Sequence, residues 1–191
     1  MTGQAASPQI RPLGGLPALE EGESFVGYLA RYAHDLELVP IGKVLDRVGL
    51  GDRPLEANAL EAHDPETGEE LRQLLGLDQA TFDRLRSWGT RSGVARILGH
   101  DIPDVLVSVH RRRCCPDCFR DRPFHQARWD LIVLPGCSRH RTALRGACSA
   151  CGTVFRWGST GAPRCPSPDC GLSFEEQAAG APMEEDATEG A

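Results

Sequence analysis

The stretches CCPDC (114–118), CSRH (137–140), CSAC (148–151) and CPSPDC (165–170) place two sets of metal-ligand residues one after the other. The first set is Cys115, Cys118, Cys137 and His140, and the second is Cys148, Cys151, Cys165 and Cys170. Zinc prefers four thiolate or imidazole ligands in a tetrahedron, and four protein ligands leave no open position for a substrate. The spacing therefore predicts two structural zinc ions per chain and argues against a metalloenzyme.

Other assignments of these residues stay open. Eight cysteines also allow a disulfide framework, although the two CxxC pairs and His140 favour metal in a reducing compartment. The all-cysteine set can hold iron instead of zinc. In the first set Cys114 competes with Cys115, while His110 and His125 compete with His140. We choose Cys115 and His140 because each completes a pair with two intervening residues.

Charge is spread unevenly along the chain. The 191 residues carry a net charge of −6, but six of the 27 acidic residues and none of the 21 basic ones lie in 175–191. Nine arginines and only three acidic residues lie from Arg111 to Arg145, so we expect this segment to contact phosphates or an acidic protein surface. The first residues contain no apolar signal-peptide segment, and no apolar run is long enough for a membrane span. We expect a cytoplasmic protein.

The residues before the cysteines have a helical pattern. Ser24 is a candidate N-cap, and apolar residues then recur at helical spacing: Phe25, Leu29, Tyr32, Ala33 and Leu36. Pro40 opens a second predicted helix that ends at Gly49. We expect a flexible leader over 1–20 and a helical domain over 21–108.

A helix-turn-helix pair is predicted inside that domain. A helix over 67–76, a turn over 76–78 and a second helix capped by Asp78 give this pattern, as any αα-hairpin would. The candidate nucleic-acid-binding residues are Arg84, Arg86 and Arg91 at this pair, and Arg111, Arg112 and Arg113 before the first cysteines. Residues 94–99 are expected as another short helix, and 105–109 as a strand or connector.

The fold class that follows is a mainly α, helix-turn-helix-like N-terminal region followed by two small zinc-ribbon modules. We place the first metal module at 109–146 and the second at 147–174. Residues 175–191 lack large apolar side chains after Phe174, apart from one methionine, and are expected to form a disordered acidic tail. No phosphate-binding loop and no zinc-deaminase motif occurs, so we expect no catalytic residues and no small-molecule substrate.

Taken in order, these motifs resemble the TniQ family of transposition proteins. The resemblance runs through GESF (22–25) with Leu29 and Arg31, RCCPxC (113–118), His125-x3-Trp129, CSRH (137–140), CSACG (148–152) and the final cysteine pair. It implies a non-catalytic target-selection factor, including CRISPR-associated examples. Such a factor links target DNA or a guide-RNA complex to an AAA+ ATPase of the TnsC/TniB type. The resemblance also implies the eight metal ligands chosen above.

Two other functions compete with that interpretation. A stand-alone DNA-binding transcriptional regulator would use the helix pair and would depend on Arg84 and Arg86. A ribbon-type redox protein would hold iron in the second set and would be coloured.

Overall fold

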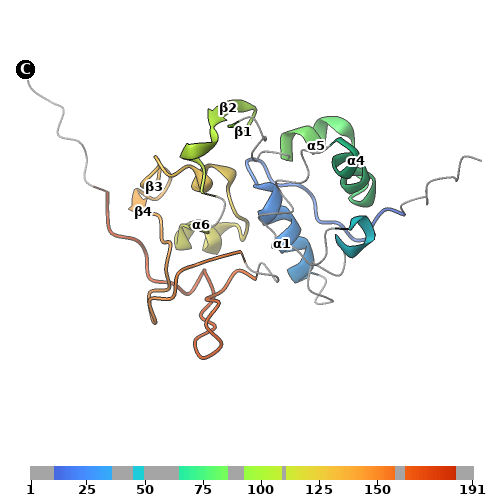
Figure 1. Cartoon of the computed structure of the whole chain (residues 1–191). Coiled ribbons are helices and arrows are strands. Elements are labelled where there is room, and N and C mark those ends of the chain that lie inside the picture. Colours follow the sequence, from blue (N-terminus) through green and yellow to red (C-terminus); the bar gives the residue numbers. More distant parts are fainter. Residues whose placement is uncertain are drawn as a thin grey trace, which may run out of the picture.

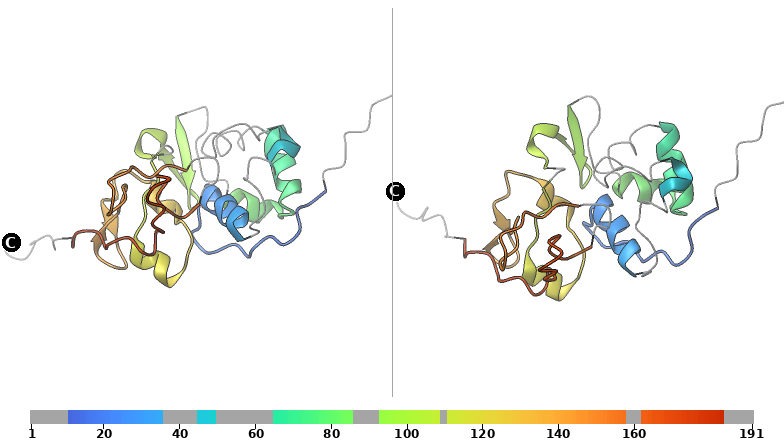
Figure 2. Two further views of the ribbon diagram at one scale, coloured as in Figure 1. Left: turned by 90° about the horizontal axis from the view of Figure 1, so that it is seen from below. Right: turned by 60° about the horizontal axis from the view of Figure 1, so that its bottom comes forward.

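The computed structural model describes residues 11–35, 45–49, 65–85, 93–108, 111–157 and 162–183. Helices from the first half of the chain lie on one side of the molecule and the cysteine-rich segments on the other (Figure 1). We call these the helical region (residues 11–85) and the cysteine-rich region (residues 111–183). Helix α1 (Phe25–Asp35) lies beside the cysteine-rich region, and the further views in Figure 2 show the same division.

Helix α1 begins as the sequence predicts. The Oγ of Ser24 accepts the backbone N–H of Gly27 at 3.0 Å, which satisfies one of the free donors of the first turn. The expected apolar residues Phe25, Leu29 and Tyr32 are buried, and Leu36 lies outside the described residues. The helix therefore buries most of its length and forms the centre of the helical core.

Two further helices cover α1. Helix α4 (Pro65–Leu74) and helix α5 (Gln79–Leu85) are joined by a turn in which Gly76 has a φ of 58°. Asp78 caps α5, because its Oδ1 accepts the N–H of Thr81 at 2.8 Å. The ring of Phe82 meets Phe25 edge to face at 6.1 Å between centroids. The two helices are confirmed, and their use in reading DNA remains a prediction.

The rest of the helical region differs from expectation in one place. The predicted leader is wrong for residues 11–20, because Leu13, Leu16 and Leu19 pack against the helical core. The 3₁₀ helix η1 (Asp46–Val48) ends at Gly49, whose φ of 71° is the left-handed conformation common at the C-terminus of a helix. Most of the helix predicted from Pro40 lies outside the described residues.

A β-hairpin replaces the short helix predicted over 94–99. Strand β1 (Val94–Ile97) pairs antiparallel with β2 (His100–Pro103), with Val94 opposite Pro103. The turn at Leu98-Gly99 has positive φ at both residues, which a helix does not allow and a two-residue hairpin turn of type I′ requires. The 3₁₀ helix η2 (Asp104–Leu106) follows, and Val107 then bridges Leu131, so this segment is the expected connector.

The cysteine-rich region contains little regular structure. Helix α6 (Pro116–Asp121) is followed by the 3₁₀ helix η3 (Ala127–Asp130), and β3 (Gly136–Cys137) pairs with β4 (Thr142–Ala143). One apolar core lies between both sets of ligands. Phe119, which follows Cys118 of the first set, packs edge to face on Phe174, with 5.3 Å between ring centroids. The side chain of Trp157, although it belongs to the cysteine-rich region, is buried in the helical core.

The predicted disordered tail is wrong for residues 175–183. Arg120 donates to the carbonyls of Glu175 at 2.7 Å and Gln177 at 2.8 Å, and Gln177 is fully buried. Farther on, Pro182 bridges Thr142 on β4. Long-range hydrogen bonds hold this segment despite its composition, and 184–191 lie outside the described residues. In the part of the chain that is described, no helix is long and apolar enough to cross a membrane.

Candidate metal centres

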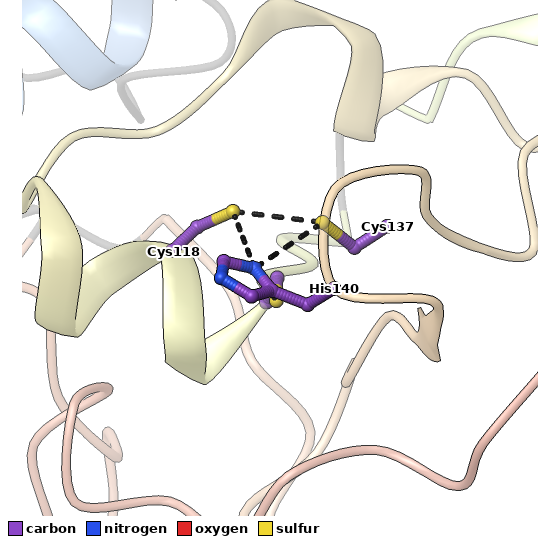
Figure 3. Close-up of side chains that lie close together, drawn as sticks. Cys118, Cys137 and His140 are labelled. Carbon is purple, nitrogen blue, oxygen red and sulfur yellow. Dashed lines mark hydrogen bonds between the residues drawn. The ribbon is translucent and has the colours of Figure 1, made fainter.

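The first predicted ligand set converges on one point. The ligand atoms of Cys115, Cys118, Cys137 and His140 all lie within 4.8 Å of one another. Figure 3 shows the ring of His140 facing the sulfurs of Cys118 and Cys137. The Nδ1 of His140 is 3.3 Å from Cys118 Sγ and 3.7 Å from Cys137 Sγ, and the two sulfurs are 3.5 Å apart.

These separations fit a tetrahedral zinc ion. Bond lengths of about 2.3 Å to sulfur and 2.0 Å to nitrogen place two sulfurs about 3.8 Å apart and a sulfur and a nitrogen about 3.5 Å apart. Every ligand position is taken by a protein atom, so the geometry is that of a structural metal centre. The fold can therefore hold one ion here without rearrangement of the chain.

Local structure explains how the first set converges. Cys115 precedes the first turn of α6, where Pro116 fixes the backbone, and Cys118 lies within that turn. Cys137 ends β3, and the turn to β4 brings back His140, with Arg141 N–H donating to the Cys137 carbonyl at 2.8 Å. Two tight turns thus present two pairs of ligands to each other.

The second set also converges, in a more open setting. Its four sulfurs lie within 4.8 Å of one another, with Cys148 Sγ 3.7 Å from Cys170 Sγ and Cys151 Sγ 3.5 Å from Cys165 Sγ. Each sulfur pair therefore has nearly tetrahedral spacing. Gly152 and Gly171 follow the two turns with φ of 75° and 61°, a conformation that a side chain disfavours.

Each set contains a thiol whose pKa is lowered, although the pKa values of Cys118 and Cys165 are raised. The hydrogen bond from Cys118 lowers the pKa of Cys115 to about 5. At Cys148 burial raises the pKa, but hydrogen bonds from the backbone N–H groups of Cys151 and Ala150 and from the thiols of the same set together lower it to about 6. Thiolates are the form that binds metal, so both centres offer one at neutral pH.

The competing residues lie outside both clusters. All eight cysteines are free, so the structure contains no disulfide framework. Burial raises the pKa of Cys114 to about 12, which keeps this thiol protonated at neutral pH. His110 lies outside the described residues, and His125 makes other contacts.

His125 joins the helical region to the cysteine-rich region. Its Nε2 donates to the carbonyl of Arg113 at 3.1 Å, so its Nδ1 is free to accept the hydroxyl of Ser24 at 2.9 Å. Burial lowers the pKa of His125 well below its usual range, with a contribution from the nearby cation Arg112. Asp130 Oδ1 is 3.7 Å from Nε2, which completes a Ser, His and Asp grouping. Ser24 is 0% exposed, so this grouping fastens two regions and offers no surface to a substrate.

The predicted nucleic-acid arginines separate into three groups. Arg84 and Arg111 are exposed, whereas Arg86 and Arg91 lie outside the described residues. The prediction is wrong for Arg112, which is 2% exposed and lies over the rings of Trp157 and Phe174.

Arg113 is also used internally. Its guanidinium is half-buried and donates to the carbonyls of Trp129, Leu131 and Leu134, so it supports the loop before β3 and is not displayed to phosphates. The exposed arginines around the first centre are instead Arg120, Arg122, Arg139 and Arg141. Nothing in the sequence pattern distinguished the buried arginines from the exposed ones.

A small helical region joined to two closed four-ligand clusters defines a scaffold with two possible metal-binding sites. The TniQ family model matches residues 16–144, which is more than half of the chain and runs from before α1 to the end of β4. The chain therefore belongs to the TniQ family, whose members take part in target selection during transposition. Comparison with curated proteins gives no match.

Proposed function

We propose that this protein is a non-catalytic transposition adaptor whose cysteine-rich region is held together by two zinc ions. The observation that carries the proposal is the family match, because it covers α1, the α4–α5 pair and the first metal centre as one continuous unit. In this role the protein links target DNA, or a guide-RNA effector complex, to an AAA+ ATPase of the TnsC/TniB type.

Zinc is the ion that this donor set favours. Three thiolates with one imidazole, and four thiolates, are the usual structural zinc ligands, and zinc undergoes no redox change that would disturb a scaffold. When bound, the ion supplies only cohesion, because every coordination position is held by the protein. The surrounding side chains then present rigid surfaces to other macromolecules.

The exposed arginines beside the first centre are the surface that we assign to phosphate contacts. Arg139 and Arg141 flank His140 on either side, and the side chain of Arg139 is 58% exposed. Arg111 and Arg84 are exposed as well and remain candidates. Contacts of this kind release cations that are condensed on the phosphates, and this release is less favourable at high salt. Binding to DNA should therefore fall steeply with ionic strength.

A binding experiment with purified zinc-loaded protein tests the adaptor role. The AAA+ ATPase encoded in the same transposon is immobilised, and capture is measured with and without duplex DNA. We expect the ATPase to capture the protein, and to capture Arg84→Ala equally well. A free-standing regulator would instead use the helix pair to bind DNA, and Arg84 would matter for that binding. Failure to bind the ATPase under both conditions would overturn the proposal.

Metal analysis separates the adaptor from a redox protein. We expect two zinc ions per chain and no absorbance in the visible range. A coloured protein with iron in the second set would favour electron transfer instead.

A further inference from the structure

His140 has two nitrogen atoms with different neighbours. Its Nδ1 faces the sulfurs of the first centre, at 3.5 Å from Cys115 Sγ and 3.3 Å from Cys118 Sγ. Its Nε2 points away from them and lies 3.3 Å from Oδ2 of Asp121. Nδ1 is therefore the nitrogen placed to bind a metal, and Nε2 is the nitrogen placed to carry the proton.

A ligand histidine needs a partner for that second nitrogen. An imidazole bound through one nitrogen is neutral and keeps its hydrogen on the other, and a carboxylate that accepts this hydrogen fixes the orientation of the ring and makes it a better ligand. We propose that Asp121 is this carboxylate, a positioning residue that holds His140 for the metal. The inference rests on the proposed metal binding and deepens it.

Helix α6 places Asp121 where this role requires it. Cys118 and Asp121 are three residues apart on α6, so one face of the helix supplies both a metal ligand and the carboxylate for another ligand. Arg139, which precedes His140, donates to the same Oδ2 of Asp121 at 2.9 Å and holds the carboxylate beside the ring.

The plain alternative is a surface ion pair between Arg139 and Asp121. Their side chains are 58% and 40% exposed, and such a pair contributes little to stability by itself. That alternative gives Asp121 no influence on the metal. Asp117 offers a matched comparison, because it lies on the same helix and pairs with Arg120 instead.

The test uses the full-length protein loaded with cadmium, a spectroscopic substitute for zinc. Cadmium NMR distinguishes a centre with three sulfurs and one nitrogen from a centre with four sulfurs, so each metal is followed separately during competition with a chelator. We expect Asp121→Ala to weaken binding at the first centre by about 10- to 100-fold, the range typical for loss of such a partner. Binding at the second centre, which has no histidine, should not change.

Two more measurements separate positioning from general support of the fold. Asp117→Ala should leave both metals bound as in the wild type. Nitrogen NMR of the histidines should show a slowly exchanging proton on His140 Nε2 in the wild type and a fast-exchanging one in Asp121→Ala.

The outcomes are distinguishable. Equal retention of metal by Asp121→Ala and Asp117→Ala would overturn the inference, as would loss of both metals from Asp121→Ala. A wild-type protein that binds no metal would instead overturn the proposed function.

Discussion

The two candidate metal centres have the same number of ligands, but the loops that they close contact the helical region by different means. The first loop, 119–136, pairs with the start of α1: Ser24 N–H donates to the His125 carbonyl at 2.9 Å, and Ala127 N–H donates to the Gly22 carbonyl at 2.9 Å. The second loop, 152–164, contributes the side chain of Trp157 to the helical core. Hydrogen bonds are directional and apolar burial is not. We therefore expect the first centre to set the orientation of the two regions and the second to add cohesion.

Removing one ligand from each centre is the strongest way to break this comparison. Binding of structural zinc is worth on the order of 10–16 kcal/mol in small peptides, so a lost ligand should cost several kcal/mol at either centre. We expect Cys137→Ser to abolish hydrogen-exchange protection at the amides of Ser24 and Ala127. The exposed ligand Cys151 should behave differently: Cys151→Ser should retain that protection and change the tryptophan fluorescence, to which Trp157 contributes.

Cys114→Ser is the control for the thiol-to-hydroxyl change. This cysteine is buried next to Cys115 but belongs to neither cluster, so the variant should keep both metals. Its free energy of unfolding should fall only by the cost of burying a hydroxyl group, about 1–3 kcal/mol. Loss of protection at Ser24 in Cys151→Ser, equal to that in Cys137→Ser, would show that the centres do not differ as described.

The convergence of the two ligand sets and the start of α1 were predictable because their signals are local. The spacing of a CxxC pair brings two sulfurs together through a single turn, and an apolar repeat with Ser24 in front defines a helix start. The hairpin at 94–103 was not predicted, because its local signal is ambiguous. A short apolar run fits a strand or a helix equally well, and the turn at Leu98-Gly99 decides between them.

Contacts between distant residues account for the remaining differences. Nine arginines between 111 and 145 look alike in the sequence, and only packing against Trp157 and Phe174 buries Arg112. The acidic composition after Phe174 argued for disorder, but Gln177 accepts hydrogen bonds from Ser149 N–H at 2.7 Å and from its hydroxyl at 3.0 Å. No local pattern marks either partner of such a contact.

Replacing Arg112, which contacts Trp157 of the second loop, tests how that loop joins the helical region. Its guanidinium lies 4.3 Å from the ring centroid of Trp157 and 4.6 Å from that of Phe174, so it links the helical core to the cysteine-rich core. Burial lowers the pKa of Arg112 to about 10, and it remains a cation at neutral pH near the buried carboxylate of Asp130. Arg112→Ala should lower the free energy of unfolding by about 3–5 kcal/mol, because it removes a buried cation near Asp130 together with its packing on both rings.

Urea unfolding in excess zinc measures this loss. The neighbour Arg111 is exposed, so Arg111→Ala should change the free energy of unfolding by less than about 0.5 kcal/mol. Similar stabilities for the two alanine variants would mean that the guanidinium of Arg112 is dispensable for joining the two cores.

The smallest expected effect tests the polar contact at the first loop through pH. Burial lowers the pKa of His125 in the folded protein. Near pH 6.5 the imidazole therefore binds a proton in the unfolded chain but stays neutral in the folded one. Stability from this residue is thus intact above about pH 6.5 and falls as the pH is lowered, by at most about 1.4 kcal/mol per pH unit. We expect the wild type to show this extra loss between about pH 6.5 and 5, and His125→Gln to lack it.

Comparing variants isolates this contribution, because metal release at low pH affects both proteins. His34 is exposed on α1, and His34→Gln should follow the wild-type curve. If His125→Gln also follows it, the imidazole titrates alike in both states. The contact with Ser24 would then not be the buried, directional junction that distinguishes the first centre from the second.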